Sequence, residues 1–82
     1  MSVRYFAGAA AEAGTDEEQI TLMVPPPLTL ATLLDEVTAR HGAGLARILA
    51  ACSFIVNEVT ATGERTLDDG ARVDVLPPFA GG

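Results

Sequence analysis

The 82-residue sequence is long enough for one small domain with a single hydrophobic core. Its formal net charge of −6 argues against nucleic acid and anionic membranes as partners and favours partners with basic surfaces. The single cysteine excludes an internal disulfide framework, and no apolar run is long enough to span a bilayer, so we expect a cytoplasmic protein.

The first part of the chain is predicted to form two strands joined by a short irregular segment. Residues 2–7 alternate in a way typical of a strand, residues 8–14 form an alanine-rich helical turn or loop, and residues 15–18 are an acidic connector. Residues 19–24 alternate again and predict a second strand, which three consecutive prolines at 25–27 bring to an end.

A helix is predicted from Thr29, a plausible N-cap, to about His41, with Gly42 directly after its end. Its apolar stripe must lie on the sheet and consists of Leu30, Leu33, Leu34 and Val37. Residues 45–51 have helical spacing and predict a second, shorter helix.

The last part of the chain is rich in strand signals. Residues 53–57 predict a strand, a short strand follows near residues 59–60, and residues 71–76 predict the last strand. Before it, residues 68–70 predict a tight turn in which Gly70 supplies a positive φ. A crossover helix allows the last strand to pair in parallel with the first. The predicted fold class is α+β, a β-grasp (ubiquitin-like) roll with a mixed sheet on one main helix.

Residues 77–82 predict an extended tail that follows a domain formed by residues 1–76. Pro77 and Pro78 keep the chain extended, while Gly81 and Gly82 have no side chain that could block a narrow channel. When extended, the six residues reach roughly 20 Å. The tail therefore suits a carboxylate that is delivered as a substrate into the active site of another protein.

Four segments resemble the MoaD/ThiS family of sulfur-carrier proteins, and most closely its MoaD branch. These segments are residues 3–7, 29–34, 67–73 and 76–82. The Pro-Pro-x-x-Gly-Gly ending is the specific one, because many β-grasp domains share the other three.

The resemblance implies that this chain is the small, non-catalytic subunit of molybdopterin synthase. A ubiquitin-activating-type (MoeB-like) adenylyltransferase would use ATP to join AMP to the Gly82 carboxylate, and a sulfur donor would then form a thiocarboxylate. The sulfur would pass to cyclic pyranopterin monophosphate in the active site of a MoaE-like large subunit, within a heterotetramer. The chain itself would bind no cofactor. The tail residues expected to enter that active site are Pro77, Pro78, Phe79, Ala80 and Gly81.

Two outward apolar side chains, Phe6 and Leu76, are predicted to form the docking surface for the large subunit if the first and last strands are neighbours. Arg4 and Asp74 would flank them. Singly exposed apolar residues are common on protein surfaces, so ordinary surface exposure is the alternative interpretation.

The other reactive residue types are interpreted as structural. Cys52 is expected to be a buried structural thiol and His41 a cation at a helix end without a visible partner. One cysteine and one histidine do not suffice for a zinc site, so no metal is expected. The acidic run of residues 16–18 is interpreted as a solvated connector.

Three other functions remain open from the sequence. The chain could carry sulfur to the thiamine thiazole or to cysteine, it could be a ubiquitin-like modifier attached to lysines through Gly82, or it could be a binding module whose tail undergoes no reaction.

Overall fold

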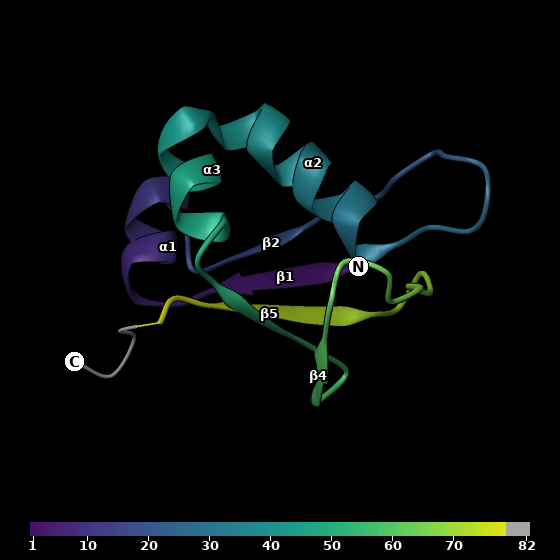
Figure 1. Ribbon diagram of the computed structural model, residues 1–82. Coiled ribbons are helices and arrows are strands. Elements are labelled where there is room, and N and C mark those ends of the chain that lie inside the picture. The colour runs from purple at the N-terminus through teal and green to yellow at the C-terminus, as the bar shows by residue number, and fades with distance from the viewer. Residues whose placement is uncertain (79–82) are drawn as a thin grey trace.

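A five-stranded mixed sheet, covered by helices on one face, organises the computed structural model (Figure 1), which describes residues 1–78. The strand order is β2-β1-β5-β3-β4. The elements are β1 (Ser2–Tyr5), α1 (Ala7–Ala13), β2 (Glu17–Gln19), α2 (Leu30–His41), α3 (Ala43–Leu49), β3 (Ser53–Val56), β4 (Val59–Ala61) and β5 (Arg72–Leu76). The predicted α+β β-grasp roll is confirmed.

The first and last strands lie side by side in the centre of the sheet. β1 and β5 are parallel, with Val3 opposite Val73 and Tyr5 opposite Val75. All four of these side chains are buried beneath the helices. The predicted parallel pairing is therefore confirmed. The last residues of β5 are anchored by this pairing and by the burial of Val73 and Val75.

Helix α2 supplies the opposite wall of the core. Leu30, Leu33 and Val37 are fully buried, whereas Leu34 is half-buried at the edge of the same stripe. Thr29 caps the helix as predicted, because its Oγ1 accepts a hydrogen bond from the Thr32 N–H at 3.3 Å. Gly42 follows the helix with φ of +90°, a conformation that favours glycine.

The second strand was predicted at residues 19–24, and this placement is wrong. β2 covers Glu17–Gln19 and pairs antiparallel with β1, Ser2 lying opposite Gln19. Hydrogen bonds continue this ladder by one step at each end. Ile20 and Met1 exchange two of them, from the Ile20 N–H to the Met1 carbonyl oxygen at 2.8 Å and from the Met1 amine to the Ile20 carbonyl oxygen at 3.0 Å, and the Tyr5 N–H donates to the Asp16 carbonyl oxygen at 2.8 Å. Residues 21–24 alternate like a strand but have no neighbouring backbone to pair with, because β1 begins at Ser2.

Smaller differences concern turns and helix starts. The first strand ends at Tyr5 rather than at Ala7, because Ala7 has φ of +49° and begins α1. The third helix begins at Ala43, two residues earlier than predicted. Gly70 does not supply a positive φ; its turn is closed by the Ala71 N–H, which donates to the Asp68 carbonyl oxygen at 3.0 Å.

Candidate functional site

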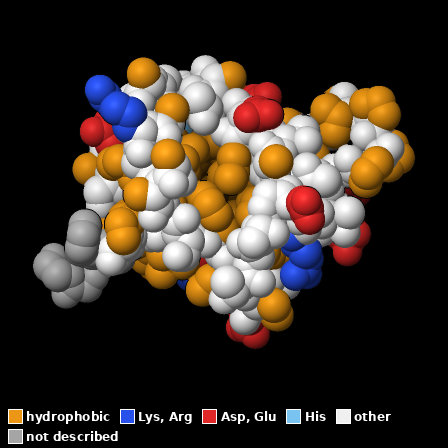
Figure 2. Space-filling view, viewed as in Figure 1, with side chains coloured by type: hydrophobic (Ala, Val, Ile, Leu, Met, Phe, Trp, Pro, Cys, Tyr) orange, Lys and Arg blue, Asp and Glu red, His pale blue; other side chains and the backbone are white. Residues whose placement is uncertain are grey.

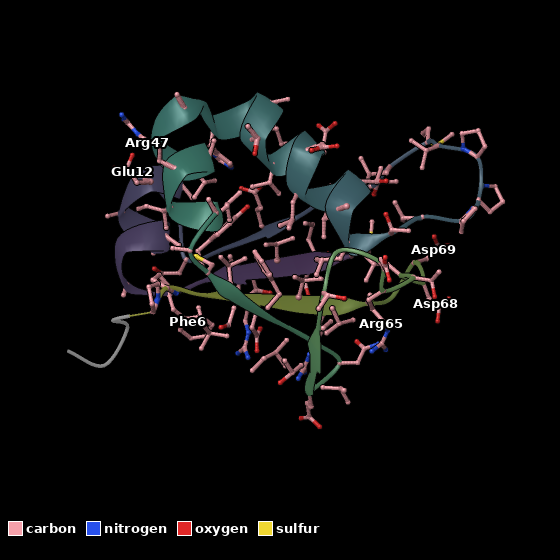
Figure 3. All side chains as sticks on the ribbon, in the orientation of Figure 1. Phe6, Glu12, Arg47, Arg65, Asp68 and Asp69 are labelled. Carbon is pink, nitrogen blue, oxygen red and sulfur yellow. The ribbon has the colours of Figure 1, made fainter. Side chains whose placement is uncertain are left out.

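The start of the predicted tail lies at the end of the central strand pair. The Phe6 N–H donates to the Val75 carbonyl oxygen at 3.2 Å, so the parallel pairing sets Phe6 next to Leu76. Phe6 is 36% exposed and Leu76 is half-buried. Figure 3 shows Phe6 at the end of the molecule where β5 stops. Pro77, half-buried, and Pro78, exposed, follow directly.

The remaining predicted tail residues lie outside the described residues. They are Phe79, Ala80, Gly81 and Gly82, the last of which is predicted to carry the reactive carboxylate.

The four outward residues predicted to flank the tail are brought together. Arg4 donates to both carboxylate oxygens of Asp74, from Nε at 2.9 Å and from a terminal nitrogen at 3.0 Å. This carboxylate raises the pKa of the Arg4 guanidinium above its usual value. The guanidinium carbon also lies 5.5 Å from the centre of the Phe6 ring. Arg4 is thereby fixed between Asp74 and Phe6, and the apolar pair has a charged border.

An open depression of about 390 Å³ adjoins this surface. It is lined on one side by Arg4, Phe6 and Ala7 and on the other by Asp16 and Glu17. The surface near the tail root thus offers apolar, cationic and anionic groups within one small area, a combination suited to recognition of a protein partner.

A partly buried polar cluster links β2 to the end of α2. His41 lies in the last turn of α2 as predicted, but the interpretation of Glu18 as a solvated connector residue was wrong. Nε2 of His41 lies 2.8 Å from Oε2 of Glu18, and the two side chains are only 18% and 17% exposed. Glu18 is therefore not a solvated connector residue, and His41 has a partner. The sequence contained only a partial signal: Glu18 precedes the apolar Ile20 by two residues, and alternate residues of a strand share a face. That this face is the core face follows from the register, in which Glu18 lies opposite Val3.

Tyr5 completes this cluster. Its ring meets His41 edge-on, with 6.0 Å between the ring centres. Its hydroxyl and Oε1 of Glu18 are buried without a hydrogen-bond partner within residues 1–78. Burial, followed by the nearby Glu18 charge, raises the pKa of the Tyr5 phenol far above its usual range. Tyr5 is buried and both other side chains are less than one fifth exposed, so we interpret the cluster as a structural link and not as a reaction centre.

Cys52 has the surroundings of a structural thiol. It is half-buried, and its Sγ donates to the Ile48 carbonyl oxygen at 3.1 Å. Burial raises the pKa of the thiol, which disfavours the reactive thiolate. Within the part of the chain that the structure covers, no three His, Cys, Asp or Glu side chains are grouped to hold a metal ion. No helix there is long and apolar enough to cross a membrane.

Comparison with known proteins points to one family. Two similar proteins are molybdopterin synthase sulfur carrier subunits, from Emericella nidulans (26% identity over all of this chain and 97% of the other) and from Phaeosphaeria nodorum (29%, over all of this chain and 90% of the other). The fold is shared with SAMP1 from Haloferax volcanii, which superposes with a TM-score of 0.81 at 22% identity, over 100% of this chain and 98% of the other. The chain matches the ThiS family over residues 3–82 and therefore belongs to it.

Proposed function

We propose that this chain is the sulfur-carrier subunit of a molybdopterin synthase and that Gly82 is its reactive residue. The observation that carries the proposal is the family match, which extends through the Gly81-Gly82 ending. The two sulfur carrier subunits named above support the choice of pathway, because they are similar over the whole of this chain. In this proposal residues 1–76 are the domain and residues 77–82 the tail.

The chemistry follows from the weakness of a carboxylate as an electrophile. A ubiquitin-activating-type adenylyltransferase joins the Gly82 carboxylate to AMP from ATP and releases pyrophosphate. The acyl-adenylate then has a good leaving group. Hydrosulfide supplied by the sulfur donor attacks the carbonyl carbon, a C–S bond forms as the C–O bond to AMP breaks, and the products are the thiocarboxylate and AMP. The chain supplies no catalytic group. Its part is to present an unobstructed terminus on a short extended stem, in the cytoplasm.

The body of the protein contributes recognition. We propose that Phe6 and Leu76 contact the large synthase subunit, while Pro77 to Gly81 lead Gly82 into that subunit's active site. Arg4, held by Asp74, adds a positioned cation to this contact. The prolines lower the ordering entropy that the tail loses on entry.

Intact mass spectrometry tests the proposal directly. The full chain is incubated with its cognate adenylyltransferase, ATP and a sulfur donor, and we expect the mass increase of one oxygen-to-sulfur exchange. A chain without Gly82 and a reaction without ATP should both show no exchange. The Cys52→Ser variant should still show it, which excludes a persulfide on the only cysteine. The loaded chain and its large subunit should then convert cyclic pyranopterin monophosphate into molybdopterin.

Other results would contradict the proposal. Absence of exchange at Gly82 would remove the carrier function. Exchange at Gly82 followed by sulfur transfer only with a thiazole synthase would assign the chain to another sulfur pathway. Amide-linked adducts on lysines of other proteins, dependent on Gly82, would instead indicate a modifier.

A further inference from the structure

A projecting apolar loop lies at the end of the molecule opposite the tail root. The loop, residues 21–28, joins β2 to α2 and is called the end loop here. In Figure 1 it extends away from the sheet, on the far side from the end of β5. Five consecutive residues of it, 23–27, are apolar and exposed, and Met23 is 93% exposed. Figure 2 shows hydrophobic side chains gathered on this projection. Contiguous exposed apolar surface of this kind marks an interaction site more often than singly exposed residues do.

The end loop borders a depression with an acidic edge. An open cavity of about 520 Å³ is lined by apolar side chains of the loop, by Leu67, and by Asp68 and Asp69. Figure 3 places Asp68 and Asp69 at the opposite end of the molecule from Phe6. The surface thus combines an apolar projection with a depression whose lining is apolar on the loop side and carries two adjacent carboxylates on the other.

We propose that the end loop and this acidic edge form a second docking surface, which binds a protein partner while the tail occupies a different enzyme. The partner's contact surface is apolar and carries Arg or Lys side chains where it meets Asp68 and Asp69. The net charge of −6 favours such a partner over long range as well. Three consecutive prolines stiffen the loop, so it loses little entropy on binding.

A second copy of this chain fits the surface less well. In a two-fold dimer each copy would bring Asp68 and Asp69 to the same contact, and four carboxylates would repel one another. The basic residues of the chain are all arginine, and none of them lines this depression to offset the carboxylates. The same charges disfavour an anionic membrane.

The inference does not depend on sulfur transfer, and crosslinking followed by affinity measurement tests it. A photo-crosslinking amino acid replaces Met23 in one full-length chain and Val59 in another, Val59 being a 57% exposed apolar residue on β4. We expect a crosslinked partner from position 23 that is absent from position 59. The partner is identified, purified, and its Kd for the unlabelled chain is measured.

Four matched chains then define the contact. Met23→Ser combined with Val24→Ser should raise Kd about tenfold or more. Asp68→Asn combined with Asp69→Asn should raise Kd less, and its effect should shrink in high salt. Val59→Ser and a chain without Gly81 and Gly82 should bind as the unchanged chain does. Equal thermal unfolding of all four chains excludes misfolding as the cause.

Several outcomes would overturn the inference. They are no crosslink specific to position 23, a crosslink only to a second copy, or a Kd that the loop variant leaves unchanged. Loss of binding on removal of Gly81 and Gly82 would also overturn it, because the partner would then be a tail-binding enzyme. Failure of thiocarboxylate formation together with the expected Kd pattern would refute the proposed function and leave this docking surface standing.

Discussion

Two features of individual residues could not be read from the composition: the Glu18–His41 pair and the buried hydroxyl of Tyr5. The Glu18–His41 pair is largely shielded from water, where a polar group is retained when it has a hydrogen-bond partner of this kind. The pair joins the three-residue edge strand β2 to the end of α2, and so adds a side-chain link to the backbone pairing of that strand with β1. Tyr5 lies against both side chains with its hydroxyl unpaired within residues 1–78.

The pKa shift of Tyr5 predicts how stability changes at alkaline pH. The folded pKa is raised, so the unfolded chain loses the phenolic proton first, near pH 10. Stability from this group is therefore complete below about pH 10 and declines as pH rises, by up to about 1.4 kcal/mol per pH unit. Tyr5→Phe should remove that part of the decline. Burial also raises the pKa of the Cys52 thiol, which adds to the alkaline decline of both chains. Only the difference between Tyr5→Phe and the unchanged chain therefore reports the phenol.

Phenolate absorbance reports this group directly, because the chain has one tyrosine and no tryptophan. In the folded protein the phenolate should appear only as the protein unfolds, whereas in denaturant it should appear in the ordinary range. Titration of the folded protein in the ordinary range, with parallel stability curves for Tyr5→Phe and the unchanged chain, would contradict the burial argument.

At the level of elements, prediction from local periodicity and from the crossover helix was correct, but it failed for the strand whose extent depends on where its partner begins. Helix α2 followed from its apolar spacing and the Thr29 cap, and the strands from their alternation. The second strand was misplaced because alternation at residues 19–24 says nothing about where β1 begins, which limits the pairing to Glu17–Gln19. The contact of Phe6 with the tail root was predictable from parallel pairing, but the buried Glu18–His41 pair required that register.

The start of α1 contains strain that a single substitution should relieve. Ala7 is exposed and has φ of +49°, which costs an L-residue about 1–2 kcal/mol and costs glycine almost nothing. We expect Ala7→Gly to raise the free energy of unfolding by about 0.5–1 kcal/mol, after the greater unfolded-state entropy of glycine is subtracted.

Ala11→Gly is the matched control, because Ala11 is exposed within the same helix and its replacement should lower the free energy of unfolding by about 1 kcal/mol. Urea unfolding of both variants separates the two cases. Destabilisation of similar size at both positions would show that Ala7 is not strained.

At the scale of the whole molecule, the first and last strands are parallel neighbours in the middle of the sheet, so both ends of the described chain contribute to the core. The chain closes its core with β5, and Val75 is the last fully buried residue of the part that the structure describes. Beyond it, Pro77 is half-buried and Pro78 is exposed. The proposed division after residue 76 therefore leaves this last fully buried residue in the body, which is the arrangement a carrier needs if its tail is to enter other proteins without unfolding its own core.

This division predicts that stability and sulfur loading are separable. Deleting residues 79–82 should leave the free energy of unfolding unchanged within about 0.5 kcal/mol, since single changes outside packed regions rarely exceed that amount. The same deletion should abolish thiocarboxylate formation.

Val75→Ala should have the opposite pair of effects. The cavity left opposite Tyr5 should lower the free energy of unfolding by about 1–3 kcal/mol, while sulfur loading persists in conditions where the protein stays folded. Denaturant unfolding and intact mass spectrometry on the same two samples give both quantities. If the deletion destabilised the body as much as Val75→Ala does, the tail would be part of the folded core. A carrier that extends its terminus into a partner would then lose that packing free energy each time it binds.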